Sequence, residues 1–234
     1  MTVLRPVRAG NAFEETVERL LQAIKLGVVA PGEKLPPERE LAVQLGISRV
    51  TLREAIRALQ ESGYLDVRRG RYGGAFVTYT PPPPAAGDLR QAVAEMGVDD
   101  LADALTFRMA VECGAAQVLA TSPLTQEQRD LLRRRLADLN AAAPGDYRRL
   151  DTAFHLSIAE LTGSTLLAST CADARLRVTD LLNAIPMLQV NIEHAATQHE
   201  AIVAAILAGD PEAARRAVTE HLEGTAALLR GFLT

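Results

Sequence analysis

Three of the four histidines in the chain, together with one aspartate, have the spacing of a metal-binding site. Asp151 lies four residues before His155, so the two side chains share a face if their segment is helical. His199 and His221 fall in two further apolar segments with helical periodicity. Helical bundles build metal sites in this way, because side chains from facing helices converge on the interior. Three neutral imidazoles and a carboxylate suit zinc, nickel, cobalt, iron or manganese, and a coordination number above four leaves positions open for water or a ligand.

The same residues also have a simpler interpretation. Taken singly, a histidine in an apolar helix is more often a core residue with a satisfied hydrogen bond, or a surface residue, than a ligand. Spacing alone leaves this alternative open.

The segments that would position these residues are rich in alanine, leucine, arginine and glutamate, with a period of about 3.6 residues. Gly209 and the pair Asp210-Pro211 mark the end of one helix and the start of the next. Cys113 and Cys171 lie inside apolar helical patterns and are expected to be buried free thiols. The pattern predicts an all-α bundle of about seven helices, at 88–97, 99–121, 125–141, 145–162, 165–184, 188–208 and 211–231.

A proline-rich segment at residues 80–88 separates this bundle from the first part of the chain. Four consecutive prolines favour a stiff, extended linker, because proline cannot enter a helix interior or a central strand. We therefore expect one domain at 1–79 and a second at 89–234.

The first domain contains the pattern of a helix-turn-helix. Two short helical segments flank Gly46, and Ser48 is placed to cap the second one. Arg49 and Arg53 are four residues apart on that second helix, with Thr51 beside them. The start of this helix reaches base edges in the major groove, where arginine pairs best with guanine. The pattern favours a DNA reader, although arginines on a helix are usually only a solvated face.

The residues that follow have the pattern of a β-wing. A strand is expected at 63–69, a glycine-rich turn at 70–74 and a returning strand at 75–78. Arg68, Arg69 and Arg71 crowd the expected tip, where they can touch phosphate or enter a minor groove. The helix-turn-helix, the wing and the helical bundle together predict a mainly α protein. It would consist of an N-terminal winged helix-turn-helix (α+β) followed by an all-α bundle.

Charge is distributed unevenly between the two parts. Residues 1–80 carry 12 Lys+Arg against 9 Asp+Glu, whereas residues 81–234 carry 13 against 20. The acidic excess behind the whole-chain pI of about 5.6 therefore lies outside the expected DNA-binding domain. Only the local field at a binding face matters for phosphate.

The N-terminal residues resemble the GntR family of bacterial winged-helix repressors. The resemblance is carried by Pro31 to Pro36, Glu38 to Ala42, Leu45 to Ala58, and Gly63 with the wing. It implies that Arg39 clamps a phosphate or base, that Arg49 and Arg53 read the operator, and that Arg69 with Gly70 enters the minor groove. One departure is Pro37, where the family often has a capping serine.

The C-terminal residues resemble the FadR C-terminal (FCD) ligand-binding domain. The matching segments are 108–112, 151–155, 199–206 and 221–222. In metal-binding members of this group, the residues matching Asp151, His155, His199 and His221 hold a divalent ion, commonly zinc or nickel, below an effector pocket. His194 matches no ligand position and is expected to be structural or exposed.

Such a pocket would suit a small carboxylate effector. A metal with open positions binds a carboxylate directly, and a nearby arginine adds a bidentate contact. Arg108 is the candidate, although Arg108 and Glu112 at i, i+4 can equally well form a pair that only braces the helix. The sequence departs from the family at Gly163-Ser164, where asparagine commonly follows the glycine, so no polar contact is assigned there.

The whole pattern predicts a cytoplasmic transcriptional regulator, most often a repressor in this family. A homodimer would bind palindromic double-stranded operator DNA, and no apolar run has the length of a membrane span. Two alternatives remain from the residues alone: a metal-dependent, hydrolase-like enzyme, and a DNA-binding protein with a purely structural metal. The enzyme is disfavoured because no acid is placed in the sequence as an obvious general base beside the ligands, and because no nucleophile motif is present.

Overall fold

The computed structural model describes residues 12–70, 72–80, 91, 93–94 and 98–233. The chain divides into two compact units, Met1–Pro81 and Pro82–Thr234. The linker expected at 80–88 falls at this division, and all of it beyond Thr80 lies outside the described residues.

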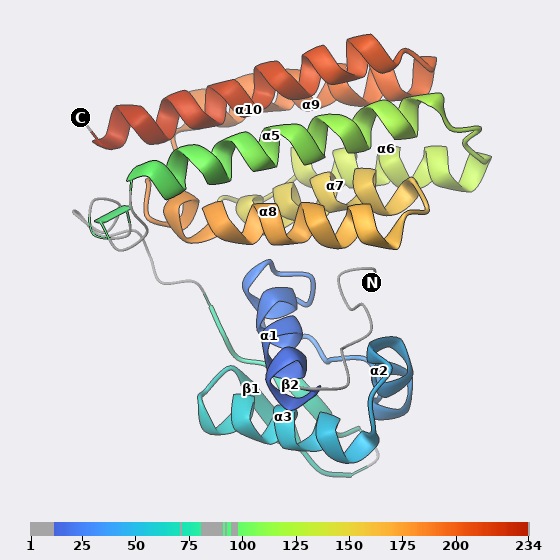
Figure 1. The fold of residues 1–234 in the computed structure, drawn as a ribbon, viewed down its shortest axis with the longest axis vertical. Helices are drawn as coiled ribbons and strands as arrows, with labels where there is room; N and C mark the ends of the chain where they lie inside the picture. The colour runs from blue at the N-terminus through green and yellow to red at the C-terminus, as the bar shows by residue number, and fades with distance from the viewer. Residues whose placement is uncertain (1–11, 71, 81–90, 92, 95–97, 234) are drawn as a thin grey trace. The chain divides into compact units, whose positions relative to one another are not determined.

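The first unit is a winged helix-turn-helix (Figure 1). The two strands are antiparallel, with Leu65 opposite Val77 and Arg68 opposite Gly74, which confirms the wing. The first strand begins two residues later than expected, because Gly63 has a φ of 78° and belongs to the turn after the preceding helix. The elements are α1 (Ala12–Lys25), α2 (Glu38–Leu45), α3 (Arg49–Glu61), β1 (Leu65–Arg68) and β2 (Gly74–Val77).

Local signals explain the turn between α2 and α3. Gly46 ends α2 in the left-handed region, with φ of 66°, where a side chain would be strained. Ser48 Oγ accepts a hydrogen bond from Thr51 N over 3.0 Å and so caps α3. Pro37 precedes α2 without forming a side-chain cap, because the proline ring has no group that can accept a hydrogen bond. These contacts fix the start of α3, and its buried side chains complete the core of this unit with α1, α2 and the hairpin: Leu52, Ala55, Ile56 and Leu59.

The second unit is a helical bundle, and the helices expected from residue 99 onward are confirmed to within a few residues. Helix α5 lies between the pair α9–α10 and the pair α7–α8, while α6 packs on α7 and α9 (Figure 1). The helix expected at 88–97 lies mostly outside the described residues. The helices are α5 (Val98–Thr121), α6 (Gln126–Asn140), α7 (Tyr147–Leu161), α8 (Thr165–Asn183), α9 (Gln189–Ala208) and α10 (Pro211–Leu233).

Side-chain caps set several of these boundaries. Thr125 and Gln128 form a reciprocal capping box at the start of α6. Ser164 Oγ accepts from Leu167 N at the start of α8, so this serine, which departs from the family pattern, has a capping role. Asp210 Oδ1 accepts from Ala213 N over 2.9 Å and starts α10, as expected. Of the helices that pack on α5, α8 and α10 therefore begin at a side-chain cap.

Two further expectations concern the cysteines and membrane-spanning helices. Cys113 and Cys171 are both buried free thiols, as predicted. Within the described part of the chain, no helix combines the length and the apolar character that crossing a membrane requires.

Candidate metal centre and nucleic-acid interface

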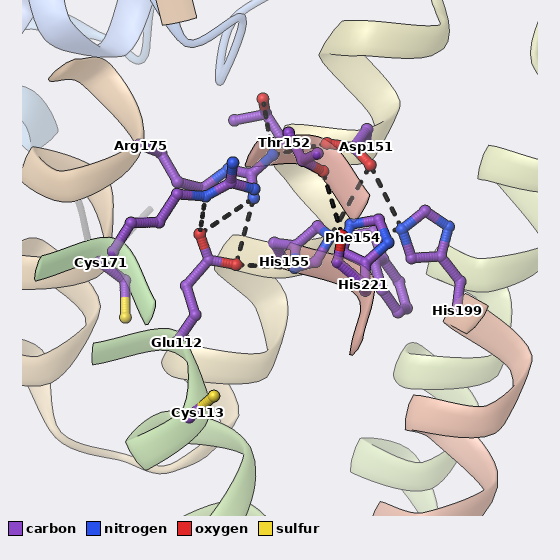
Figure 2. A network of polar contacts seen from close by, with 12 residues as sticks. Glu112, Cys113, Asp151, Thr152, Phe154, His155, Cys171, Arg175, His199 and His221 are labelled. Carbon is purple, nitrogen blue, oxygen red and sulfur yellow. Dashed lines mark hydrogen bonds and ion pairs between the residues drawn. The ribbon is translucent and has the colours of Figure 1, made fainter. Parts of the chain in front are cut away.

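The structure brings together the four residues expected to bind a metal. Asp151 and His155 come from α7, His199 from α9 and His221 from α10. One ligand atom from each residue lies within 4.8 Å of the others. The histidine side chains are buried, with relative exposures of 0–6%, and Figure 2 shows His155, His199 and Asp151 facing one another.

The spacing of these atoms fits a divalent ion. His199 Nε2 lies 3.3 Å from both Asp151 Oδ1 and His155 Nε2, and His155 Nε2 lies 3.7 Å from Asp151 Oδ1. Two ligands each about 2.1 Å from one tetrahedral metal ion lie roughly 3.4 Å apart. His199 presents Nε2 to the cluster, and its other ring nitrogen, Nδ1, is buried with no hydrogen-bond partner among the residues that the structure describes. The donor set therefore fits zinc or a similar borderline metal.

Neighbouring side chains determine which ring nitrogens face the centre. His155 Nδ1 lies 2.8 Å from Glu112 Oε2, and His221 Nδ1 lies 3.2 Å from Gln198 Oε1. Each ring then donates from Nδ1 and keeps a lone pair on Nε2. Oxygen partners of this kind orient metal-binding histidines and fix their tautomer.

A buried ion-pair network surrounds the centre. Glu112 Oε1 accepts from Arg108 Nε over 2.7 Å, and Arg175 Nη1 lies 3.2 Å from both Glu112 oxygens. Arg175 Nη2 reaches Asp151 Oδ2, so Asp151 turns its other oxygen to the histidines (Figure 2). An acid does stand beside the candidate ligands, because Glu112, from the facing helix α5, contacts His155 directly. The sequence spacing did not indicate this contact.

Arg175 was not recognised in the sequence as part of the site. A signal was present, because Arg175 continues a buried stripe of α8 made of small apolar residues, and its own side chain is only 3% exposed. A charged residue in such a stripe requires a charged partner.

The charges of the site keep Glu112 and Asp151 ionised, and burial keeps the His155 and His221 rings neutral. Burial alone would raise the pKa of Glu112, but Arg108 and then Arg175 hold it well below its ordinary value. Burial likewise opposes ionisation of Asp151, and Arg175 together with His155 keeps its pKa well below the ordinary value. Burial lowers the pKa of His155 to about 4, with Arg175 acting in the same direction, and lowers that of His221 well below its ordinary value. Neutral imidazoles and an ionised carboxylate are the forms that bind a metal.

The remaining predicted residues of the bundle are placed as follows. Arg108 is buried and forms an ion pair with Glu112. This pair is one of the two roles that the sequence suggested for Arg108. His194 is exposed on α9, as expected, although it lies five residues before the buried His199.

On the first unit, the predicted DNA-reading residues lie at the exposed start of α3. Arg53 Nε donates to Glu38 Oε2 of α2 over 2.7 Å, and Arg49 Nη2 lies 3.7 Å from the same oxygen. Both arginine side chains are about 60% exposed, so their guanidinium groups remain accessible. Thr51 is half-buried, and its hydroxyl lies 2.9 Å from Ser48 Oγ, within the cap.

The arginines of the wing that the structure describes are exposed at the end of the hairpin. Arg68 Nε donates to Asp66 Oδ2 over 2.7 Å, and its guanidinium lies 4.4 Å from the centre of the Phe76 ring. Arg68 is the last residue of β1, opposite Gly74, so it lies beside the turn as predicted, and these contacts brace the hairpin. Arg71 lies outside the described residues. Arg69 and Gly70 are exposed at the turn, where Gly70 has a φ of 99°, and Arg39 is exposed on α2.

The two halves of this architecture match two family descriptions. The bacterial regulatory proteins of the gntR family match residues 13–77, and the FCD domain matches residues 103–224. The chain therefore belongs to the gntR family of bacterial transcriptional regulators, in the FadR-like group that carries an FCD domain.

Proteins similar along most of the chain are regulators of the same kind. The HTH-type transcriptional regulator RmpR of Mycobacterium gastri is 31% identical over 88% of this chain and 76% of its own length. A protein of Escherichia coli K12 assigned as an L-lactate dehydrogenase operon regulator is 29% identical over 94% of this chain and 86% of its own. The family consists of regulators rather than enzymes, so the hydrolase-like alternative is set aside.

A solved structure supports the fold alone. The structure of E. coli McbR/YncC has a TM-score of 0.58 and 20% identity, and the match covers 95% of this chain and 99% of that one.

Proposed function

We propose that this regulator is a metal-dependent sensor in which the FCD bundle binds a small carboxylate and thereby controls operator binding. The observation that carries the proposal is the convergence of Asp151, His155, His199 and His221 in the bundle interior. Zinc or nickel suits this donor set, and when bound it supplies a positive charge with open positions for a carboxylate oxygen. The relative named for an L-lactate dehydrogenase operon is consistent with a small acid as effector.

Arg108 is the candidate for a second contact to the effector. Glu112 binds its Nε and keeps the side chain within the buried network around the centre. The terminal amino groups of the same guanidinium form the edge that suits a bidentate carboxylate contact. In this arrangement, Glu112 would hold both Arg108 and His155 in place.

The winged unit supplies the DNA-binding half of the proposal. Arg49 and Arg53, with Thr51 beside them, would lie in the major groove, Arg39 on the phosphates, and Arg69 with Gly70 in the minor groove. A homodimer would place two such units on the two half-sites of a palindromic operator, in the cytoplasm where the DNA is accessible. An effector with different affinities for the DNA-competent and DNA-incompetent states is sufficient for control, and repression is the proposed output.

The metal and the effector can be tested together. Elemental analysis of wild type, His199→Ala and His194→Ala should find about one divalent ion per chain in wild type and His194→Ala, and none in His199→Ala. The exposed His194 is the matched control on the same helix. In a thermal-shift screen, small carboxylates should then stabilise only the two proteins that retain the metal, because ligand binding to the folded state raises its stability.

Other outcomes separate the alternatives. A full complement of metal with no carboxylate response, and DNA binding unaffected by carboxylates, would indicate a purely structural ion. Failure to bind metal after reconstitution would contradict the sensor proposal and leave the DNA-binding unit unaffected.

A further inference from the structure

One apolar side chain on α3 lies in an unexpected place. Val50 is 65% exposed, although it is the second residue of a well-packed helix. Leu52, two residues later, is fully buried, and two residues of an α-helix lie about 200° apart around the axis. Val50 therefore points almost directly away from the core of the winged unit. Valine also has a modest helix propensity, so this position contributes little to the fold.

The polar neighbours of Val50 also make contacts within the winged unit. Arg49 and Arg53 both turn toward Glu38 on α2, at 3.7 and 2.7 Å. Thr51 uses its hydroxyl and its backbone N–H in the cap with Ser48. Thr51, predicted from the sequence to contact DNA, is the less exposed of the two residues, and Val50 presents its methyl groups beside the arginines.

The chemistry of the major groove leaves one suitable partner for those methyl groups. Base edges there present hydrogen-bond donors and acceptors, which an aliphatic side chain cannot satisfy, and one apolar group, the 5-methyl of thymine. A β-branched residue is well suited to this contact, because its χ1 angle is already restricted in a helix and little freedom is lost on binding.

We propose that Val50 is a specificity-determining residue that recognises the 5-methyl group of one thymine in each operator half-site, next to the bases contacted by Arg49 and Arg53. The inference rests on the proposed function, since it requires α3 to enter the major groove.

The test begins with a selection of binding sequences from random duplex DNA by the full-length wild-type protein. Each thymine of the selected operator is then replaced singly by deoxyuridine, which removes only the methyl group. Wild type should lose about three- to fivefold in affinity at one thymine per half-site, as expected for one buried methyl group. Val50→Ala removes the contact in both half-sites of the dimer, so it should bind the thymine operator about 9- to 25-fold more weakly than wild type. It should show no further loss with deoxyuridine at that position.

Val43→Ala is the matched control, because Val43 is a 77% exposed valine on the neighbouring helix α2. It should keep the wild-type sensitivity to deoxyuridine, and thermal unfolding should show that both variants are folded. Val50→Ala with the same deoxyuridine sensitivity as wild type, or an operator in which every thymine tolerates replacement, would overturn the inference alone. A selection that enriches no sequence would overturn specific DNA binding by this chain, and the inference with it.

Discussion

Glu112 Oε2 lies 2.8 Å from His155 Nδ1, on the side of the ring opposite the nitrogen that faces Asp151 and His199. The acid thus fixes the tautomer of one proposed ligand without being a ligand itself. The same carboxylate binds Arg108 and Arg175, so it links the candidate metal centre to both buried arginines.

Glu112→Gln should weaken metal binding. The glutamine can still accept a hydrogen bond from His155. It lacks the negative charge that makes the metal-facing nitrogen of the ring more basic and therefore a stronger metal ligand. We expect about a 10- to 100-fold loss of zinc affinity, the usual effect of removing a partner of a metal-binding histidine. Competition against a chromophoric chelator measures this change. Glu220→Gln, at an exposed acid next to His221, should match wild type; equal losses in both variants would contradict the role of Glu112.

Arg175→Met should lower the free energy of unfolding, most strongly in metal-free protein. Arg175 compensates the charges of Glu112 and Asp151, and removing one partner of a buried ion pair costs about 3–5 kcal/mol. A bound metal would compensate Asp151 and reduce the loss. Urea unfolding with and without zinc checks both expectations. Arg177→Met, at an exposed position of the same helix, should have little effect.

Much of this fold follows from local sequence signals. Gly46, Ser48 and the glycines of the wing set turns that depend on few neighbours, so the helix-turn-helix and hairpin were predicted well. The helices of the bundle follow from periodicity and from caps such as Asp210. The grouping of the four candidate ligands came from the i, i+4 pair and the family resemblance, and the structure places these residues together.

The contacts around the ligands depend on tertiary packing. Arg175 is 63 residues from Glu112 and 24 from Asp151 in the chain, so no spacing rule connects them. The pairing of Arg68 with Asp66 is different, because residues two apart share a face of a strand, and alternation could have predicted it. The exposure of Val50 could likewise not be predicted without knowing which face of α3 packs against the core.

Arg53→Ala and Arg49→Ala should each weaken operator binding by about 1–3 kcal/mol and relax the preference for one base pair. Fluorescence anisotropy on the selected operator and on single-base variants measures both effects. Arg57→Ala is the control on the same helix, because Arg57 is exposed and pairs with Glu61 one turn later. Operator affinity and base preference that stay unchanged in both variants would contradict the assignment of α3 as the reading helix.

Acid should destabilise the metal-free protein. The pKa of His155 is about 4 in the folded state, mainly because the ring is buried, against an ordinary 6.5. As the pH falls from 6.5 to 4, the unfolded chain therefore binds a proton that the folded chain does not, and unfolding becomes more favourable. Glu112 and Asp151 add to this effect at lower pH, because their pKa values are depressed in the folded state and their stabilisation is lost as they are protonated.

The measurement is the free energy of unfolding of chelator-treated protein between pH 8 and pH 4. The free energy of unfolding of wild type should be independent of pH above pH 7 and should fall progressively below pH 6.5. His155→Gln lacks the titrating ring, so its stability should depend less on pH between 6.5 and 4.5, whatever its stability at neutral pH. Identical slopes in the two proteins would show that His155 takes up its proton equally easily folded and unfolded, and would contradict its burial as a neutral ring.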